Sequence, residues 1–190
     1  MTAITVSETA SRATARTALE IALGYAAARI REEGGNNRGD QVEFFQRLMG
    51  GAPGDPWCAD FVCACLVKAY ARLHGLGEDR ERLPQYVPAV RAAILPLSGR
   101  CYALAMAARS RRMLRDAEFE PLPGDLVLFD FRRLGEPHHV GFVESVQADG
   151  GLMTVEGNTV PGPGVDQADG DGVYRRARGR EGVSGFVHFA

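Results

Sequence analysis

The sequence predicts an α+β fold in which N-terminal helices pack on an antiparallel β-sheet of about five to six strands. Apolar residues recur at helical spacing near the N-terminus, as Leu19, Leu23 and Ile30 do. From residue 121 onward the pattern changes to short apolar runs separated by turn signals, of which Asp149-Gly150 is the strongest. Helices followed by hairpin-linked strands are typical of a helical layer on one antiparallel sheet.

Size and composition agree with one folded domain. The chain has 190 residues, and 45% of them are hydrophobic, which is enough for a core. We assign residues 1–12 to a polar tail and residues 13–190 to a single domain. The formal net charge of -2 gives no argument for a nucleic-acid partner. No run of about eighteen apolar residues is present, so no integral membrane segment is expected.

The N-terminus lacks the basic start and apolar middle of a secretory signal. We therefore expect the protein to be synthesised in the cytoplasm without a signal peptide.

Two helices are predicted ahead of residue 50. Residues 14–32 form an amphipathic helix that ends at the glycine- and asparagine-rich turn of residues 34–40. Apolar spacing within residues 42–49 predicts a short second helix, and a glycine-rich loop over residues 50–54 follows it.

A third helix is predicted to be buried and to carry a cysteine in its first turn. Asp55 is a suitable N-cap, and Pro56 suits the first helical position because its missing N–H is not needed there. The apolar run that follows is too continuous for a surface helix. The helix is expected to end near His74-Gly75, because glycine commonly terminates helices.

Residues 76–120 read as a helical insertion interrupted by prolines. Residues 103–116 are helical by composition and carry several arginines, for which a solvated face is the simpler interpretation. We expect this insertion to shape the substrate groove.

The second half contains five predicted strands. Pro123-Gly124-Asp125 forms the turn that precedes the first strand. The predicted strands are residues 126–131, 139–146, 152–156, 172–177 and 183–189.

Cys58 is the strongest candidate nucleophile. In the first turn of a helix, the helix dipole and the unpaired N–H groups favour a thiolate and can also stabilise an oxyanion. Packing is the alternative for an isolated cysteine. We interpret Cys63 and Cys65 as core residues, and the four cysteines do not indicate a disulfide framework in a domain of this size.

A thiolate nucleophile needs a base, and histidine titrates in the required range. His138 and His139 stand at the head of a predicted strand, where successive side chains face opposite ways. Only one of them can therefore point at Cys58. His74 is expected to cap its helix, and His188 to be packed or solvated in the last strand.

Four motifs, in this order along the chain, carry a resemblance to a known family. The sequence is similar to the CHAP domain, of the NlpC/P60 group of papain-like cysteine amidohydrolases and peptidases. The segment of residues 32–39 also resembles the stretch before the nucleophile in some members. The motifs are Trp57-Cys58-Ala59-Asp60-Phe61-Val62, Pro123-Gly124-Asp125-Leu126-Val127-Leu128-Phe129, His139-Val140-Gly141-Phe142-Val143 and Glu156-Gly157-Asn158-Thr159.

The resemblance implies a papain-like fold and hydrolysis of amide bonds in peptidoglycan, by an endopeptidase or an N-acetylmuramoyl-L-alanine amidase. It implies Cys58 as nucleophile and His139 as base, because the family histidine stands directly before Val-Gly. It favours Glu156 as the orienting acid, with Asn158 in support. Two departures are His138, where many members carry glycine, and Trp57, where some carry the glutamine that supplies an oxyanion donor.

Hairpin geometry conflicts with the choice of Glu156. If Asp149-Gly150 is a two-residue turn, Gly141 faces Asn158, and Glu156 lies roughly 13 Å from His139. A slip of two places, or a bulge, would bring Glu156 beside Gly141 and within reach of the histidine. We follow the resemblance and predict Glu156 as the orienting acid.

Three further residues are candidates for substrate binding. Trp57 either lines the groove or packs in the core, and Asn37 either contacts substrate or serves ordinary turn chemistry beside glycine. His138 is the histidine that is not expected to act as base.

No metal and no cofactor are predicted. Asp166, Asp169 and Asp171 lie in a glycine-rich loop, but they do not match an EF-hand, and a solvated acidic loop is the simpler interpretation. Zinc held by Cys58 and the adjacent histidines lacks an evident fourth ligand.

The favoured hypothesis is a cysteine peptidoglycan hydrolase whose substrate is a peptidoglycan peptide. It would act on the cell wall or in the periplasm after release or delivery, as a phage lysin or an antibacterial effector, with a possible immunity or delivery partner. The alternatives are a non-catalytic module that binds wall fragments or a partner protein, and an amidase acting on a small cytoplasmic amide.

Overall fold

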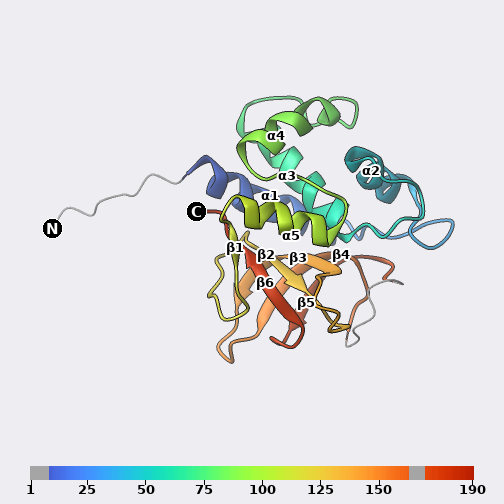
Figure 1. Ribbon diagram of the computed structural model, residues 1–190. Coiled ribbons are helices and arrows are strands. Elements are labelled where there is room, and N and C mark those ends of the chain that lie inside the picture. Colours follow the sequence, from blue (N-terminus) through green and yellow to red (C-terminus); the bar gives the residue numbers. More distant parts are fainter. Residues whose placement is uncertain (1–8, 163–169) are drawn as a thin grey trace.

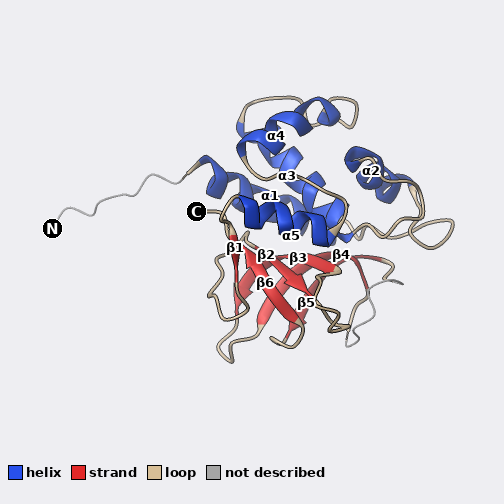
Figure 2. Ribbon diagram, viewed as in Figure 1, coloured by secondary structure: helices blue, strands red, loops and turns tan. Residues whose placement is uncertain are grey.

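The computed structural model describes residues 9–162 and 170–190, which form a helical layer on a six-stranded sheet (Figures 1 and 2). The helices are α1 (Ala10–Ala27), α2 (Asp40–Met49), α3 (Cys58–Leu73), the 3₁₀ helix η1 (Leu83–Tyr86), α4 (Val87–Ala93) and α5 (Cys101–Ser110). The strands are β1 (Leu114–Arg115), β2 (Leu126–Phe129), β3 (His139–Val146), β4 (Leu152–Thr159), β5 (Gly172–Arg178) and β6 (Val183–Val187).

The sheet has the strand order β1-β6-β2-β3-β4-β5, and every neighbouring pair is antiparallel. The predicted α+β class with helices packed on an antiparallel sheet is therefore confirmed. β1 was not expected, because its two residues lie in the segment that reads as helical. The helix in that segment, α5, ends at Ser110, and the chain then adds β1 to the free edge of β6.

α3 is the central helix of the fold. It contacts α1 and α2 on one side and β3 and β4 on the other, as its enclosed position in Figure 1 shows. Phe61, Val62 and Leu66 are fully buried in it. Burying one such side chain stabilises the fold by about 1.5–3 kcal/mol, so the apolar run anchors the helix and its first residue.

The start of α3 differs from the prediction. The helix begins at Cys58 with Trp57 at the N-cap position, and no side chain caps it. Asp55 is not the N-cap; its carboxylate instead accepts the backbone N–H of Ala52 at 2.9 Å. Cys58 nevertheless occupies the first turn, as expected.

The end of α3 agrees with the prediction. The helix stops at His74, and Gly75 follows with φ 63°, the left-handed conformation that favours glycine. The His74 ring lies 2.8 Å from the carbonyl oxygen of Tyr70 in the last turn.

α1 begins at Ala10, inside the predicted tail of residues 1–12, and residues 1–8 lie outside the described part of the chain. The Thr9 hydroxyl caps the helix by accepting the N–H of Arg12 at 3.1 Å. The Arg12 guanidinium forms an ion pair of 2.5 Å with Asp125, which also bonds His188 at 2.9 Å. This cluster ties the first helix to the last strand, and His188 is structural there.

The β3–β4 hairpin has a three-residue loop, so the predicted two-residue turn is wrong. Gln147 donates its N–H to Gly151 O at 2.7 Å, which leaves residues 148–150 as the loop, with Gly150 at φ 83°. A bulge at Glu144 then shifts the pairing by one more place. Together the two shifts place Gly141 opposite Glu156.

No helix within residues 9–162 or 170–190 is long and apolar enough to cross a membrane.

Candidate active site

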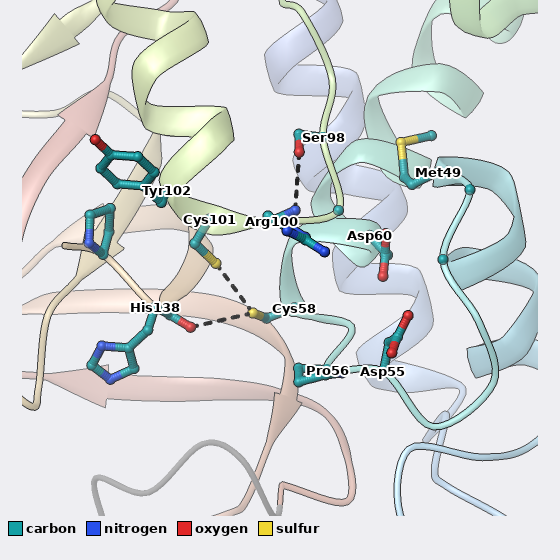
Figure 3. Close-up of a pocket in the computed structure, with 14 residues that line it drawn as sticks. Met49, Asp55, Pro56, Cys58, Asp60, Ser98, Arg100, Cys101, Tyr102 and His138 are labelled. Atoms are coloured by element: carbon teal, nitrogen blue, oxygen red, sulfur yellow. Dashed lines mark hydrogen bonds between the residues drawn. The ribbon is translucent and has the colours of Figure 1, made fainter.

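Cys58 lies at the N-terminus of α3 and lines a pocket of about 560 Å³ (Figure 3). Its residue surface is only 4% exposed, and its sulfur lies 4.0 Å from the carbonyl oxygen of His138 at the head of β3. The start of the helix and the start of the strand therefore meet at this pocket. One wall comes from residues 98–102, within the predicted insertion, as expected for a segment that shapes the groove.

His139 is fully buried beside Cys58, and its two ring nitrogens have different surroundings. Nε2 lies 2.8 Å from a carboxylate oxygen of Glu156. Nδ1 has no hydrogen-bond partner among the described residues. The carboxylate holds the ring proton on Nε2, which leaves Nδ1 as the nitrogen available to the thiol.

Glu156 is itself held by two side chains that sequence reasoning missed. Arg178 binds it in a bidentate manner, with Nε 2.8 Å from one carboxylate oxygen and Nη2 2.5 Å from the other. The Thr154 hydroxyl donates to it at 2.5 Å. Arg178 is packed over the rings of Phe129 and Phe131. These groups give the buried carboxylate a fixed orientation toward the histidine.

A glycine makes this contact sterically possible. A Cβ on Gly141 would lie 2.5 Å from Cγ of Glu156, so a side chain there would displace the glutamate. The space left by the missing side chain of Gly141 is thus filled by the Glu156 side chain.

The charges of the site favour a thiolate–imidazolium pair. Contact with the Cys101 thiol lowers the pKa of Cys58, and although burial opposes this, His139 and the N–H of Ala59 lower it further, so that it falls well below its usual value. Burial alone would lower the pKa of His139, but Cys58 and Glu156 outweigh it and raise that pKa to about 9. Burial likewise opposes ionisation of Glu156, but Arg178 and His139 hold its pKa well below the usual range.

Asn158 does not contact the histidine. With its amide oriented to satisfy its neighbours, it accepts the backbone N–H of Trp57 at 3.2 Å and donates to Gly170 O at 2.9 Å and to Asn37 Oδ1 at 3.2 Å. It stands in a left-handed conformation with φ 54° where β4 departs from regular pairing with β5. Asn158 therefore braces the residue before the cysteine.

Trp57 and Asn37 are buried, which favours the structural alternative that the sequence left open for each of them. Trp57 is fully buried, and its indole N–H donates to Glu32 at 2.9 Å. Asn37 is 4% exposed, and its amide donates to Gly54 O at 3.2 Å. Through these hydrogen bonds, both residues support the loop that precedes α3 from the interior of the protein.

His138 lines the pocket. Its side chain is 26% exposed, and Nδ1 lies 3.6 Å from the Asp130 carboxylate. Burial lowers the pKa of His138, and the nearby Arg132 charge lowers it further.

Cys101 is the least expected residue of the site. Its sulfur lies 3.5 Å from the sulfur of Cys58, as the dashed line in Figure 3 shows, and it is the first residue of α5. Cys58 is therefore not the only cysteine at a helix start. Hydrogen bonding to Cys58 and burial raise the pKa of Cys101 well above its usual value, which favours Cys101 as the thiol and Cys58 as the thiolate of the pair.

Cys101→Ala is expected to raise the pKa of Cys58, because it removes the thiol that hydrogen-bonds the sulfur anion. Below the new pKa the thiolate fraction falls, and alkylation slows. The measurement is the rate of Cys58 alkylation by iodoacetamide against pH, read by peptide mass spectrometry. Cys65→Ala, a buried cysteine elsewhere in α3, is the matched control. An unchanged midpoint in Cys101→Ala would contradict the assignment.

Among the described residues no group of three or more histidine, cysteine, aspartate or glutamate side chains is arranged to hold a metal ion. Of the aspartates considered for calcium, Asp166 and Asp169 lie outside the described part of the chain. Asp171 accepts a hydrogen bond of 2.7 Å from the Tyr174 hydroxyl.

Comparison with known proteins gives one match. The family model described as CHAP domain matches residues 50–158, more than half of the chain and a region that holds Cys58, His139 and Glu156. No curated protein and no solved structure matches the chain.

Proposed function

The chain belongs to the CHAP domain family, and on this premise we propose that it is a cysteine-dependent peptidoglycan hydrolase. Membership implies hydrolysis of peptidoglycan by an amidase or peptidase in general terms. The specific proposal is cleavage of an amide bond in the stem peptide or the cross-bridge. The observation that carries it is that His139 stands next to Cys58 and is held by Glu156, which Arg178 binds in turn.

The first half of the reaction is acyl transfer to the enzyme. The Cys58 thiolate attacks the carbonyl carbon of the scissile amide and forms a C–S bond, and the carbonyl oxygen becomes an oxyanion. The backbone N–H groups at the start of α3 are the donors proposed to stabilise that oxyanion. When the C–N bond breaks, the leaving nitrogen takes the proton from Nδ1 of His139, which leaves a thioester.

The second half releases the acid. A water molecule gives a proton to Nδ1 of His139 and attacks the thioester carbonyl. The C–S bond breaks, the carboxylic acid leaves, and the thiolate–imidazolium pair of Cys58 and His139 is restored. Glu156 keeps the imidazole ring oriented throughout and stabilises its positive charge whenever both ring nitrogens are protonated.

The buried ion pair of Glu156 supports an enzyme over a binding module. Burying charges in a protein interior is costly unless they are well paired, and here Arg178 and Glu156 orient one imidazole beside one cysteine. A module that only binds wall fragments has no use for a charged histidine in a buried position.

We propose that the protein acts on the cell wall or in the periplasm, after release or delivery from the cell that makes it. Peptidoglycan lies outside the cytoplasmic membrane, so the substrate of the family defines the place of action. A delivery or immunity partner is part of this proposal.

The function is tested by digesting purified sacculi and analysing the released fragments by mass spectrometry. New amino termini within the stem peptide identify an endopeptidase, and free lactyl groups identify an amidase. If neither product is released but the protein co-sediments with the sacculi, the protein is a binding module. No release and no binding would favour a small soluble amide as substrate.

Glu156→Gln is expected to reduce the rate more than Asn158→Ala does. The glutamine keeps the shape but loses the charge that stabilises the imidazolium and the ion pair with Arg178. Asn158→Ala removes bonds to the backbone near Trp57 without touching the ring. The measurement is kcat for each variant on sacculi-derived peptides. A larger loss in Asn158→Ala would support a Cys-His-Asn set instead.

A further inference from the structure

Asp60 is a buried carboxyl group with an unusual position in the pocket. It stands two residues after Cys58 in α3 and lines the same pocket (Figure 3). It is only 2% exposed, and its Oδ1 has no hydrogen-bond partner among the described residues. A buried polar atom without a partner lowers the stability of the fold, so a functional reason for keeping a carboxyl group at this position is expected.

The surroundings of Asp60 are negative. The carboxylates of Asp55 and Asp60 point toward each other on one side of the pocket, and Cys58 lines the same pocket (Figure 3). Burial, Cys58 and Asp55 together raise the pKa of Asp60 to about 8. Arg100 lines the pocket as well, but it forms no ion pair with Asp60 within the described residues.

The backbone opposite Asp60 is shaped around the carboxyl group. A Cβ on Gly99 would lie 2.2 Å from Oδ1 of Asp60 and 3.1 Å from its Cγ. Any side chain at residue 99 would therefore collide with the carboxyl group. Because residue 99 is glycine, the backbone that leads to Arg100 and Cys101 can pack directly against the Asp60 side chain in the pocket wall.

We propose that Asp60 is the specificity residue that binds a primary ammonium group on the substrate peptide, close to the scissile bond. An ammonium group has three donors and one positive charge, so it can pair with the Asp60 carboxyl group and offset its negative charge and that of Asp55. The inference rests on the proposed function. Stem peptides contain a diamino acid whose second amino group is free where the peptide is not cross-linked. The pocket therefore selects peptides with that amine free.

The test uses soluble muropeptides, each hydrolysed either with its amine free or after acetylation with acetic anhydride. Acetylation removes the charge and leaves the peptide otherwise unchanged. For the wild-type protein, KM is expected to be at least about tenfold lower for the free-amine form, the scale of a charge-assisted hydrogen bond. In Asp60→Asn, which keeps size and removes charge, the ratio of the two KM values is expected to fall close to one.

Asp116→Asn, an exposed aspartate outside the pocket, is the matched control and is expected to keep the wild-type ratio. Because each variant is compared on both substrates, an effect of Asp60 on the nucleophile itself cancels in the ratio. A wild-type protein with equal KM values for both forms, or an Asp60→Asn variant that keeps the wild-type ratio, would overturn the inference while the proposed function stands.

A second arm does not depend on hydrolysis. Cys58 is alkylated with 2-bromoethylammonium or with neutral 2-bromoethanol; in both reactions the thiolate displaces bromide and forms a C–S bond. The wild-type protein is expected to favour the cationic reagent several-fold more than Asp60→Asn does. Equal preference in the two proteins would overturn the ammonium site. Failure of every muropeptide to be cleaved, with this preference intact, would overturn the proposed function alone.

Discussion

Cys58→Ala is expected to abolish hydrolysis while the protein stays folded. Alanine has no nucleophile, and the acyl-transfer step has no substitute for the thiolate. Cys101 is expected not to replace it. Hydrogen bonding to Cys58 and burial both raise the pKa of Cys101, and the burial remains in the variant, so Cys101 stays a thiol. The measurement is peptide release from sacculi, alongside the thermal unfolding midpoint of the variant.

The matched control for this variant is Cys63→Ala, which removes an equally buried sulfur from the same helix. Burial raises the pKa of Cys63 to about 12, so it is no thiolate at neutral pH. Cys63→Ala should keep activity, and limited iodoacetamide treatment of the wild-type protein should label Cys58 first. Labelling of Cys63 or Cys101 first, with activity retained, would refute the assignment of the nucleophile.

His139→Ala is expected to reduce the rate at least about a hundredfold, the usual scale for loss of a general base. The variant also removes the charge that stabilises the Cys58 thiolate. For the wild-type protein, activity is expected to fall as pH rises through about 9, because His139 then loses the proton that the leaving nitrogen must receive. The measurement is kcat/KM against pH for wild type and variant.

His138→Ala is the neighbouring control. It removes an imidazole that lines the pocket but makes no contact with Glu156. Its loss of activity should be far smaller than that of His139→Ala and should appear mainly in KM. Equal losses in kcat for the two variants would mean that His138 takes part in the chemistry.

The elements of the site could be predicted from sequence where the signal is local. The buried run of α3 and its termination near Gly75 follow from apolar continuity and glycine chemistry, which depend on neighbouring residues alone. His139 as the ring beside Cys58 follows from strand alternation and the resemblance. The prediction that Asp55 caps α3 was wrong, because its carboxylate binds the N–H of Ala52 within the preceding loop.

Contacts between distant segments could not be predicted in this way. Cys101 reaches Cys58 from α5, and Arg178 reaches Glu156 from β5; each pairing depends on how whole elements pack. No periodicity in the sequence marks either residue. A physical argument could have pointed to Arg178. A carboxylate buried beside a histidine needs a cation, so an arginine on the neighbouring strand was to be expected.

The sequence by itself determined the two-layer α+β class, the buried helix whose first turn holds Cys58 and the strand that begins with His139, because helical and strand periodicities are properties of adjacent residues. The tertiary structure alone decided between Glu156 and Asn158. One extra loop residue in the hairpin would by itself have put Glu156 on the wrong face of the sheet, since side chains alternate along a strand. The bulge at Glu144 restores the face and completes a shift of two positions, which places the glutamate against Gly141 and within 2.8 Å of His139.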